Sequence, residues 1–131
     1  MYQYLTVMDV IAMNEAIMER MGTAASLLRD EGALESAMMR PQMAAHYEEA
    51  DLVTQTAVLI SGIALARAFV DGNKPTALAA GTTFVQLNGL WIESEPEELG
   101  RQIEALVIHP DSVGEATTRF VSWLYSHIRP L

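Results

Sequence analysis

Apolar positions recur at helical spacing through most of the chain. In the first such stretch they follow one another every three or four residues from Val7 to Met21, with Asn14 as a polar interruption. Thr6 precedes the stretch as a candidate N-cap, and Gly22 follows it as a natural stop. The pattern therefore predicts a first helix between them. Asn14 is expected to hydrogen-bond to a neighbouring backbone, and contact with a ligand is the alternative.

The second apolar stretch is interrupted by Pro41. Residues 27–32 are typical of a loop or short turn, and a short helix is predicted from about Ala33 to Met39, because proline disfavours a helical conformation in the residue before it. The longest helix is then expected to begin around 47–51 and to be broken by Asp71 and Gly72. Small residues on several of its faces indicate burial on most sides, so we place this helix at the centre of the fold.

The remaining pattern predicts three more helices. The first runs from about Asn73 to Leu87 and is ended by Asn88-Gly89, which tolerate the left-handed conformation. After a brief extended piece at 90–92, a further helix is expected from Ser94 and Pro96 to a stop at His109-Pro110. A last helix is expected after Ser112, with an inward face of Phe120, Trp123, Leu124, His127 and Ile128. With five or six helices and no convincing strand pattern, residues 1–131 are predicted to form one compact, single-domain all-α bundle.

Composition is consistent with such a bundle. A chain of 131 residues, 50% of them apolar, can bury one sizeable core. It contains no uncharged apolar run of about eighteen residues, which argues against a transmembrane span. The first residues also lack the basic and apolar regions of a secretory signal, so the cytoplasm is the expected compartment.

Charge and cysteine usage narrow the chemistry further. The chain has no cysteine, and its three histidines are scattered, so neither a disulfide nor a structural metal site is expected. A net charge of -9 argues against a general nucleic-acid surface, which relies on Lys and Arg to neutralise phosphates. A nucleotide remains compatible with this charge, because one local positive pocket would be enough to bind it.

The segment 69–76, FVDGNKPT, lies between the two central Ala-rich helices and leads directly into the second. The free N–H groups and positive dipole end of that helix, a glycine that permits close approach, and Lys74 together predict a phosphate-binding loop. The simpler alternative is that Asp71 and Asn73 cap the helix while Lys74 is exposed to solvent.

The same segment carries a resemblance to a known family. From Tyr47 to Gly89, and more loosely over the rest, the chain resembles the Fic/Doc family, and within it the compact Doc-like toxins. The family signature is His-x-Phe-x-Asp/Glu-Gly-Asn-Gly/Lys-Arg, and the Doc branch typically has HPFVDGNKRT where this chain has RAFVDGNKPT. The flanking segments 27–37 and 77–89 are also Doc-like. Three positions depart from the pattern: Arg67 replaces the family His, Ala68 the following Pro, and Pro75 the motif Arg.

The resemblance implies a site for ATP and Mg²⁺. It assigns Asp71 as the metal-binding carboxylate, and Gly72, Asn73 and Lys74 as the phosphate cradle. The family His handles the proton of a target hydroxyl, a role that Arg67 cannot take because a guanidinium stays protonated in proteins. Pro75 removes both a backbone N–H and a bidentate guanidinium from the phosphate side.

Two functions follow as expectations. The first is a Doc-like toxin of a toxin–antitoxin system that uses ATP to phosphorylate a protein hydroxyl, as on elongation factor Tu, or transfers AMP, with activity impaired at Arg67 and Pro75. The alternative is an inactive pseudoenzyme that binds a nucleotide, a protein or a second copy of itself. The family partner is a small antitoxin whose disordered C-terminal segment folds into a groove, and the surface around Met38, Met39 and Met43 is a candidate contact.

Overall fold

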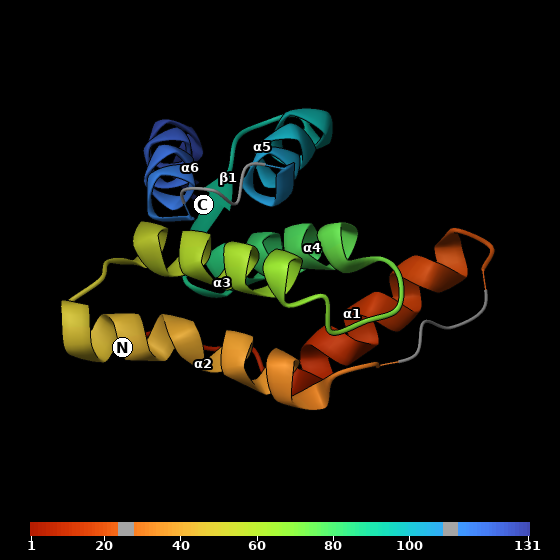
Figure 1. The fold of residues 1–131 in the computed structure, drawn as a ribbon. Helices are drawn as coiled ribbons and strands as arrows, with labels where there is room; N and C mark the ends of the chain where they lie inside the picture. The colour runs from red at the N-terminus through yellow and green to blue at the C-terminus, as the bar shows by residue number, and fades with distance from the viewer. Residues whose placement is uncertain (24–27, 109–112) are drawn as a thin grey trace.

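The computed structural model describes residues 1–23, 28–108 and 113–131 (Figure 1). Within these ranges the chain forms six helices and one two-stranded sheet. The elements are α1 (Val7–Arg20), α2 (Glu31–Glu48), α3 (Leu52–Ala66), α4 (Asn73–Leu87), β1 (Leu90–Ile92), α5 (Pro96–Ile108), α6 (Val113–His127) and β2 (Ile128–Pro130). The predicted helix stop at His109-Pro110 lies outside the described residues, as does Ser112, after which the last helix was expected to begin.

The helices form three layers with α3 and α4 in the middle. Helices α1 and α2 lie on one side of this pair, and α5 and α6 lie on the other (Figure 1). The two middle helices pack closely because Gly81 of α4 faces Ile60 of α3, where an added Cβ would lie 2.3 Å from the Ile60 Cδ1 atom. The predicted all-α fold and its two buried central helices are therefore confirmed.

Local signals set the ends of α1 and α4 where the sequence predicted them. The Thr6 hydroxyl accepts a hydrogen bond from the Asp9 N–H, and the Asp9 carboxylate accepts one from the Thr6 N–H, which completes a capping box at the start of α1. Helix α4 ends at Leu87, followed by Asn88 and by Gly89 with φ 85°. None of the described helices has the length and apolarity needed to cross a membrane.

The predicted end of the helix at Met39 was wrong, whereas its start at about Ala33 is close to the observed start at Glu31. A single helix of 18 residues passes through Pro41, and it is longer than α3, which begins only at Leu52 behind an Asp51 cap. Proline in a helix interior costs about 3 kcal/mol because it removes one hydrogen bond and crowds the preceding turn. Pro41 is itself buried, however, and continues the buried face of α2 at helical spacing: Leu34, Ala37, Met38, Pro41 and Ala44. Packing of this face against α3 outweighs the local preference to stop.

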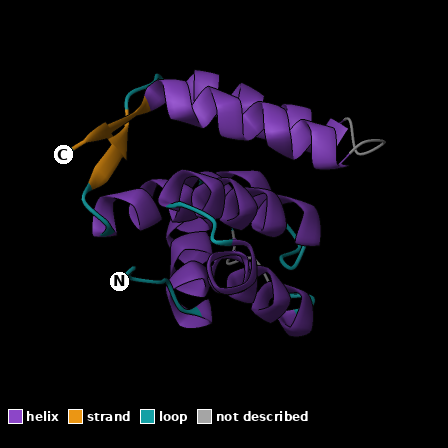
Figure 2. Ribbon diagram, turned by 90° about the vertical axis from the view of Figure 1, so that its left-hand side faces the viewer, coloured by secondary structure: helices purple, strands orange, loops and turns teal. Residues whose placement is uncertain are grey.

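The chain also contains a short two-stranded sheet, which the sequence pattern did not predict. The extended piece at 90–92 is confirmed as β1, and it pairs antiparallel with β2, so that Trp91 lies opposite Arg129 and Ile92 opposite Ile128. Ile128 therefore begins a strand instead of ending the last helix. Figure 2 shows the two strands side by side where the chain ends. Three-residue strands are too short for an alternating pattern to indicate them.

Candidate functional site

The turn from α3 into α4 is shaped by two residues with positive φ. Helix α3 ends at Arg67, which has φ 49° and ψ 42°, and Gly72 precedes α4 with φ 77°. A Cβ on Gly72 would lie 3.0 Å from the Met18 Sδ atom and 3.1 Å from the Asn14 Nδ2 atom of α1. Both the backbone conformation and the close approach of α1 therefore require glycine at this position.

Two side chains of the turn hold its backbone in place. The Asn73 amide donates from Nδ2 to the Phe69 carbonyl at 2.8 Å, and its Oδ1 atom accepts from the Phe69 N–H at 3.1 Å. The Asp71 carboxylate accepts from the Gly72 N–H at 2.7 Å. Asp71 and Asn73 thus bond to N–H groups of the loop before α4, which differs from the simple helix caps that the sequence also allowed.

Asn14 connects α1 to the same turn. Its Nδ2 group donates to the Asp71 carbonyl at 3.0 Å and to the Thr76 hydroxyl at 3.1 Å. Asn14 is fully buried, so this hydrogen bonding explains a polar residue on the apolar face of α1, as the sequence predicted. Its partners lie about sixty residues away, however, and only the folded structure identifies them.

Arg29 holds the other side of the turn. Its guanidinium donates to the Arg67 carbonyl at 2.7 Å, and its backbone N–H donates to the Ala68 carbonyl at 2.6 Å. The Asp30 N–H donates to the same Ala68 carbonyl at 3.0 Å. The segment before α2 therefore fixes the backbone from which the Arg67 side chain extends.

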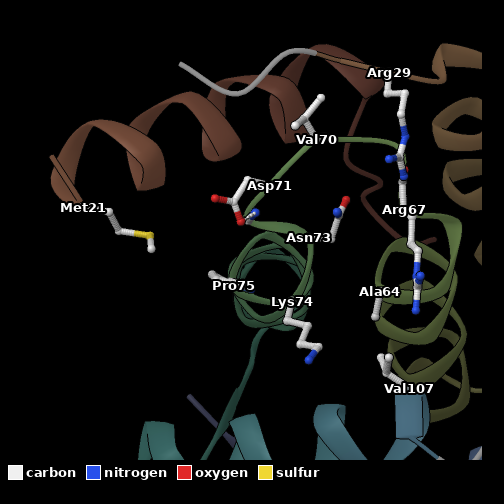
Figure 3. Close-up of a pocket in the computed structure, with 11 residues that line it drawn as sticks. Met21, Arg29, Ala64, Arg67, Val70, Asp71, Asn73, Lys74, Pro75 and Val107 are labelled. Atoms are coloured by element: carbon white, nitrogen blue, oxygen red, sulfur yellow. Dashed lines mark hydrogen bonds between the residues drawn. The ribbon is translucent and has the colours of Figure 1, made fainter. Parts of the chain in front are cut away.

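A pocket with a volume of about 410 Å³ opens beside the turn (Figure 3). Its lining includes every site residue predicted from the sequence, together with three residues from other parts of the chain and two more from α3 and the turn: Met21, Arg29, Ala64, Arg67, Val70, Asp71, Gly72, Asn73, Lys74, Pro75 and Val107. Three of these side chains are cationic, and Asp71 is the one carboxylate among them. In Figure 3, Arg67 and Lys74 both extend toward α5, whereas Asp71 points away from them. The pocket is therefore suited to an anion.

Lys74 is paired with Glu104 of α5. The two side chains are 44% and 43% exposed, so the pair is partly solvated and contributes about 0–1 kcal/mol. The Lys74 side chain is thus partly exposed, as the simpler alternative expected, but it also pairs with a carboxylate. The sequence offered no signal for Glu104, because it belongs to another helix and is brought to the pocket only by the packing of α5 against α4.

The first turn of α4 offers few donors to an anion. The N-cap residue is Gly72, so no N-cap side chain accepts from the N–H groups of this turn. Pro75 has no N–H to donate. The Thr76 N–H already donates to the Gly72 carbonyl at 3.0 Å. The N–H groups of Asn73 and Lys74 are therefore those that the helix end can present to a ligand.

The pocket could hold a metal ion only if phosphate oxygens supplied part of its ligands. Among the described residues, no cluster of three or more His, Asp or Glu side chains could hold a metal ion. Mg²⁺ in nucleotide sites is bound through one or two carboxylates, with phosphate oxygens and water completing its shell. Asp71 at the edge of a cationic pocket fits this kind of site.

Comparison with known proteins identifies similar sequences. The model of the Fic/Doc family matches residues 4–85, which include α1 to α3, the turn and most of α4. Toxin Doc from Mycolicibacterium smegmatis is 39% identical to the chain over 70 residues, which make up 52% of this chain and 54% of Toxin Doc. The chain thus spans about half the length of the curated relative that it matches.

Proposed function

The chain belongs to the Fic/Doc family, and from this premise we propose that it is a Doc-like toxin that binds the phosphates of ATP but transfers them poorly. One observation carries the proposal. The turn is fully braced by Asn73, Asn14 and Arg29, yet a guanidinium occupies the position of the family's proton-accepting His. The similarity to a protein named Toxin Doc supports the toxin assignment.

Phosphate binding is the part of the family chemistry that the pocket supports best. Lys74 and the N–H groups of Asn73 and Lys74 face the pocket from α4, and Asp71 is the carboxylate that would hold Mg²⁺. When bound, Mg²⁺ would neutralise part of the charge of the triphosphate. The cationic lining keeps an anion in the pocket despite the net charge of -9.

Transfer should be impaired because the pocket has no suitable base at position 67. The resemblance implies that a target hydroxyl, such as one on elongation factor Tu, loses its proton there. The Arg67 guanidinium stays protonated and cannot accept it. General base catalysis is worth about 10²–10⁴-fold, so a loss of that size is expected for phosphate or AMP transfer. If transfer is lost completely, the chain is an inactive module that binds a nucleotide or a protein.

The proposed partner is a small antitoxin whose disordered C-terminal segment folds on binding. Part of the predicted methionine surface is unsuitable for this contact, because Met38 is only 6% exposed and belongs to the core. Met39 and Met43 are 49% and 51% exposed, and Tyr47 follows on the same face of α2. The spacing of four residues gives these three side chains one continuous apolar stripe for such a segment.

Calorimetry with ATP and Mg²⁺ tests the binding proposal. We expect the unmodified chain to bind and Lys74→Ala to lose most of the affinity. Arg40→Ala is the matched control, because it removes an exposed cation from α2, away from the pocket. Absence of binding by the unmodified chain, or equal binding by Lys74→Ala, would contradict the proposal.

A further inference from the structure

Arg67 is the cation of the pocket whose side chain is not engaged. The Arg29 guanidinium donates to a backbone carbonyl, and Lys74 pairs with Glu104. In the described part of the chain, the Arg67 guanidinium has neither a hydrogen bond nor an ion pair, although it lines the pocket. Its five N–H donors are therefore available to a ligand.

The backbone that carries Arg67 is held firmly. Its left-handed conformation, which costs a side-chain-bearing residue about 1–2 kcal/mol, is maintained by the hydrogen bond from Arg29 to its carbonyl and by the two bonds to the next carbonyl, that of Ala68. Figure 3 shows the Arg67 side chain extending past Ala64 toward α5, in the same direction as Lys74. Arg67, directly after α3, and Lys74, in the first turn of α4, thus line the same pocket.

Resting on the proposed function, we infer that Arg67 and Lys74 bind the same phosphate group, so that Arg67 supplies the guanidinium that Pro75 no longer provides. A guanidinium can bind two phosphate oxygens at once, whereas an ammonium acts as a point charge. The ligand class is the polyphosphate of a nucleotide. Arg67 then has two effects: it removes the proton-accepting His, and it keeps a guanidinium that binds phosphate.

Glu104 gives Arg67 a specific part in binding. A phosphate approaching Lys74 must replace the Glu104 carboxylate, while it can contact Arg67 without displacing any partner. Because the Lys74–Glu104 pair is partly exposed, its replacement costs little. Arg67 therefore adds a phosphate contact that has no competing anion, whereas Glu104 competes with the phosphate for Lys74.

Binding measurements with ATP and with inorganic tripolyphosphate test this inference. Loss of a charge-assisted hydrogen bond predicts that Arg67→Ala weakens both ligands about tenfold or more. Arg67→Lys should be intermediate, because it keeps the charge and loses the two-oxygen contact. Arg67→His should also bind weakly, and Arg67→His with Pro75→Arg should recover the affinity. Arg40→Ala serves as the control, and unchanged urea unfolding of Arg67→Ala shows that the variant is folded.

The outcomes separate the inference from the function on which it rests. If Lys74→Ala loses ATP while Arg67→Ala binds both ligands as the unmodified chain does, the inference is wrong and the proposed function stands. If the unmodified chain binds neither ligand, both are wrong. If Arg67→Ala loses ATP but keeps tripolyphosphate, Arg67 contacts the nucleoside instead of the phosphates, and the inference is again wrong.

Discussion

Gly72→Ala tests whether α1 confines the turn. An alanine at position 72 must adopt φ 77°, and its Cβ would lie 3.0 Å from the Met18 Sδ atom and 3.1 Å from the Asn14 Nδ2 atom. Gly89 provides a matched control, since it has φ 85° and no atom within 4 Å of an added Cβ. Both substitutions impose the same unfavourable backbone conformation, but only Gly72→Ala also presses on α1.

The structure sets the expected difference between the two variants. Gly89→Ala should lower the free energy of unfolding by about 1–2 kcal/mol, the cost of a left-handed conformation with a side chain. At Gly72 the Asn14 amide must also shift, which weakens its hydrogen bonds to Asp71 and Thr76. With about 1–2 kcal/mol for these bonds, Gly72→Ala should cost about 2–4 kcal/mol. Effects of alanine on the unfolded chain are the same for both and cancel in the comparison.

Urea unfolding followed by far-ultraviolet circular dichroism measures this difference directly. The two variants should share the slope of the unmodified chain and differ in midpoint, with Gly72→Ala unfolding first. Equal destabilisation of the two variants would refute the reasoning, because it would mean that Asn14 and Met18 do not hold the turn.

Three further predictions concern the pocket and its support. Glu104→Gln should bind ATP up to about fivefold more tightly in calorimetry, because Lys74 loses a competing anion worth at most about 1 kcal/mol. Gly81→Ala should lower the free energy of unfolding by about 1–3 kcal/mol, measured by urea unfolding, since its Cβ would overlap Ile60. Burial, with a smaller effect of a neighbouring tyrosine, raises the pKa of Tyr4 above its usual value near 10. The folded chain therefore retains the Tyr4 proton longer and loses stability as pH rises above about 10, a loss that Tyr4→Phe should reduce in urea titrations.

The parts of the fold that the sequence predicted well are those with local signals. Helix α4 was predicted with its observed ends because the segment 71–72 breaks the chain before it and Asn88-Gly89 ends it. Helix α2 was mispredicted because proline is a local signal, whereas the burial of Pro41 against α3 is a tertiary effect. Strand β2 was missed because its pairing with β1 joins segments that are far apart in the sequence.

The site residues also divide into those with a local sequence signal and those that are placed by packing. The residues from Arg67 to Pro75 were found because they are consecutive, and all of the predicted site residues line one pocket. Asn14, Arg29 and Glu104 were not assigned to it, since each reaches the turn from a different helix or its preceding segment. A motif thus identifies the ligand-facing residues, while the contacts that hold or compete with them depend on packing.

The central claim is that Arg67 and Pro75 separate phosphate binding from phosphate transfer. Transfer of the γ-phosphate of radiolabelled ATP to purified elongation factor Tu tests it most directly. The account predicts about 10²–10⁴-fold less label with the unmodified chain than with the variant carrying both Arg67→His and Pro75→Arg. Equal labelling by the unmodified chain and the double variant would contradict it.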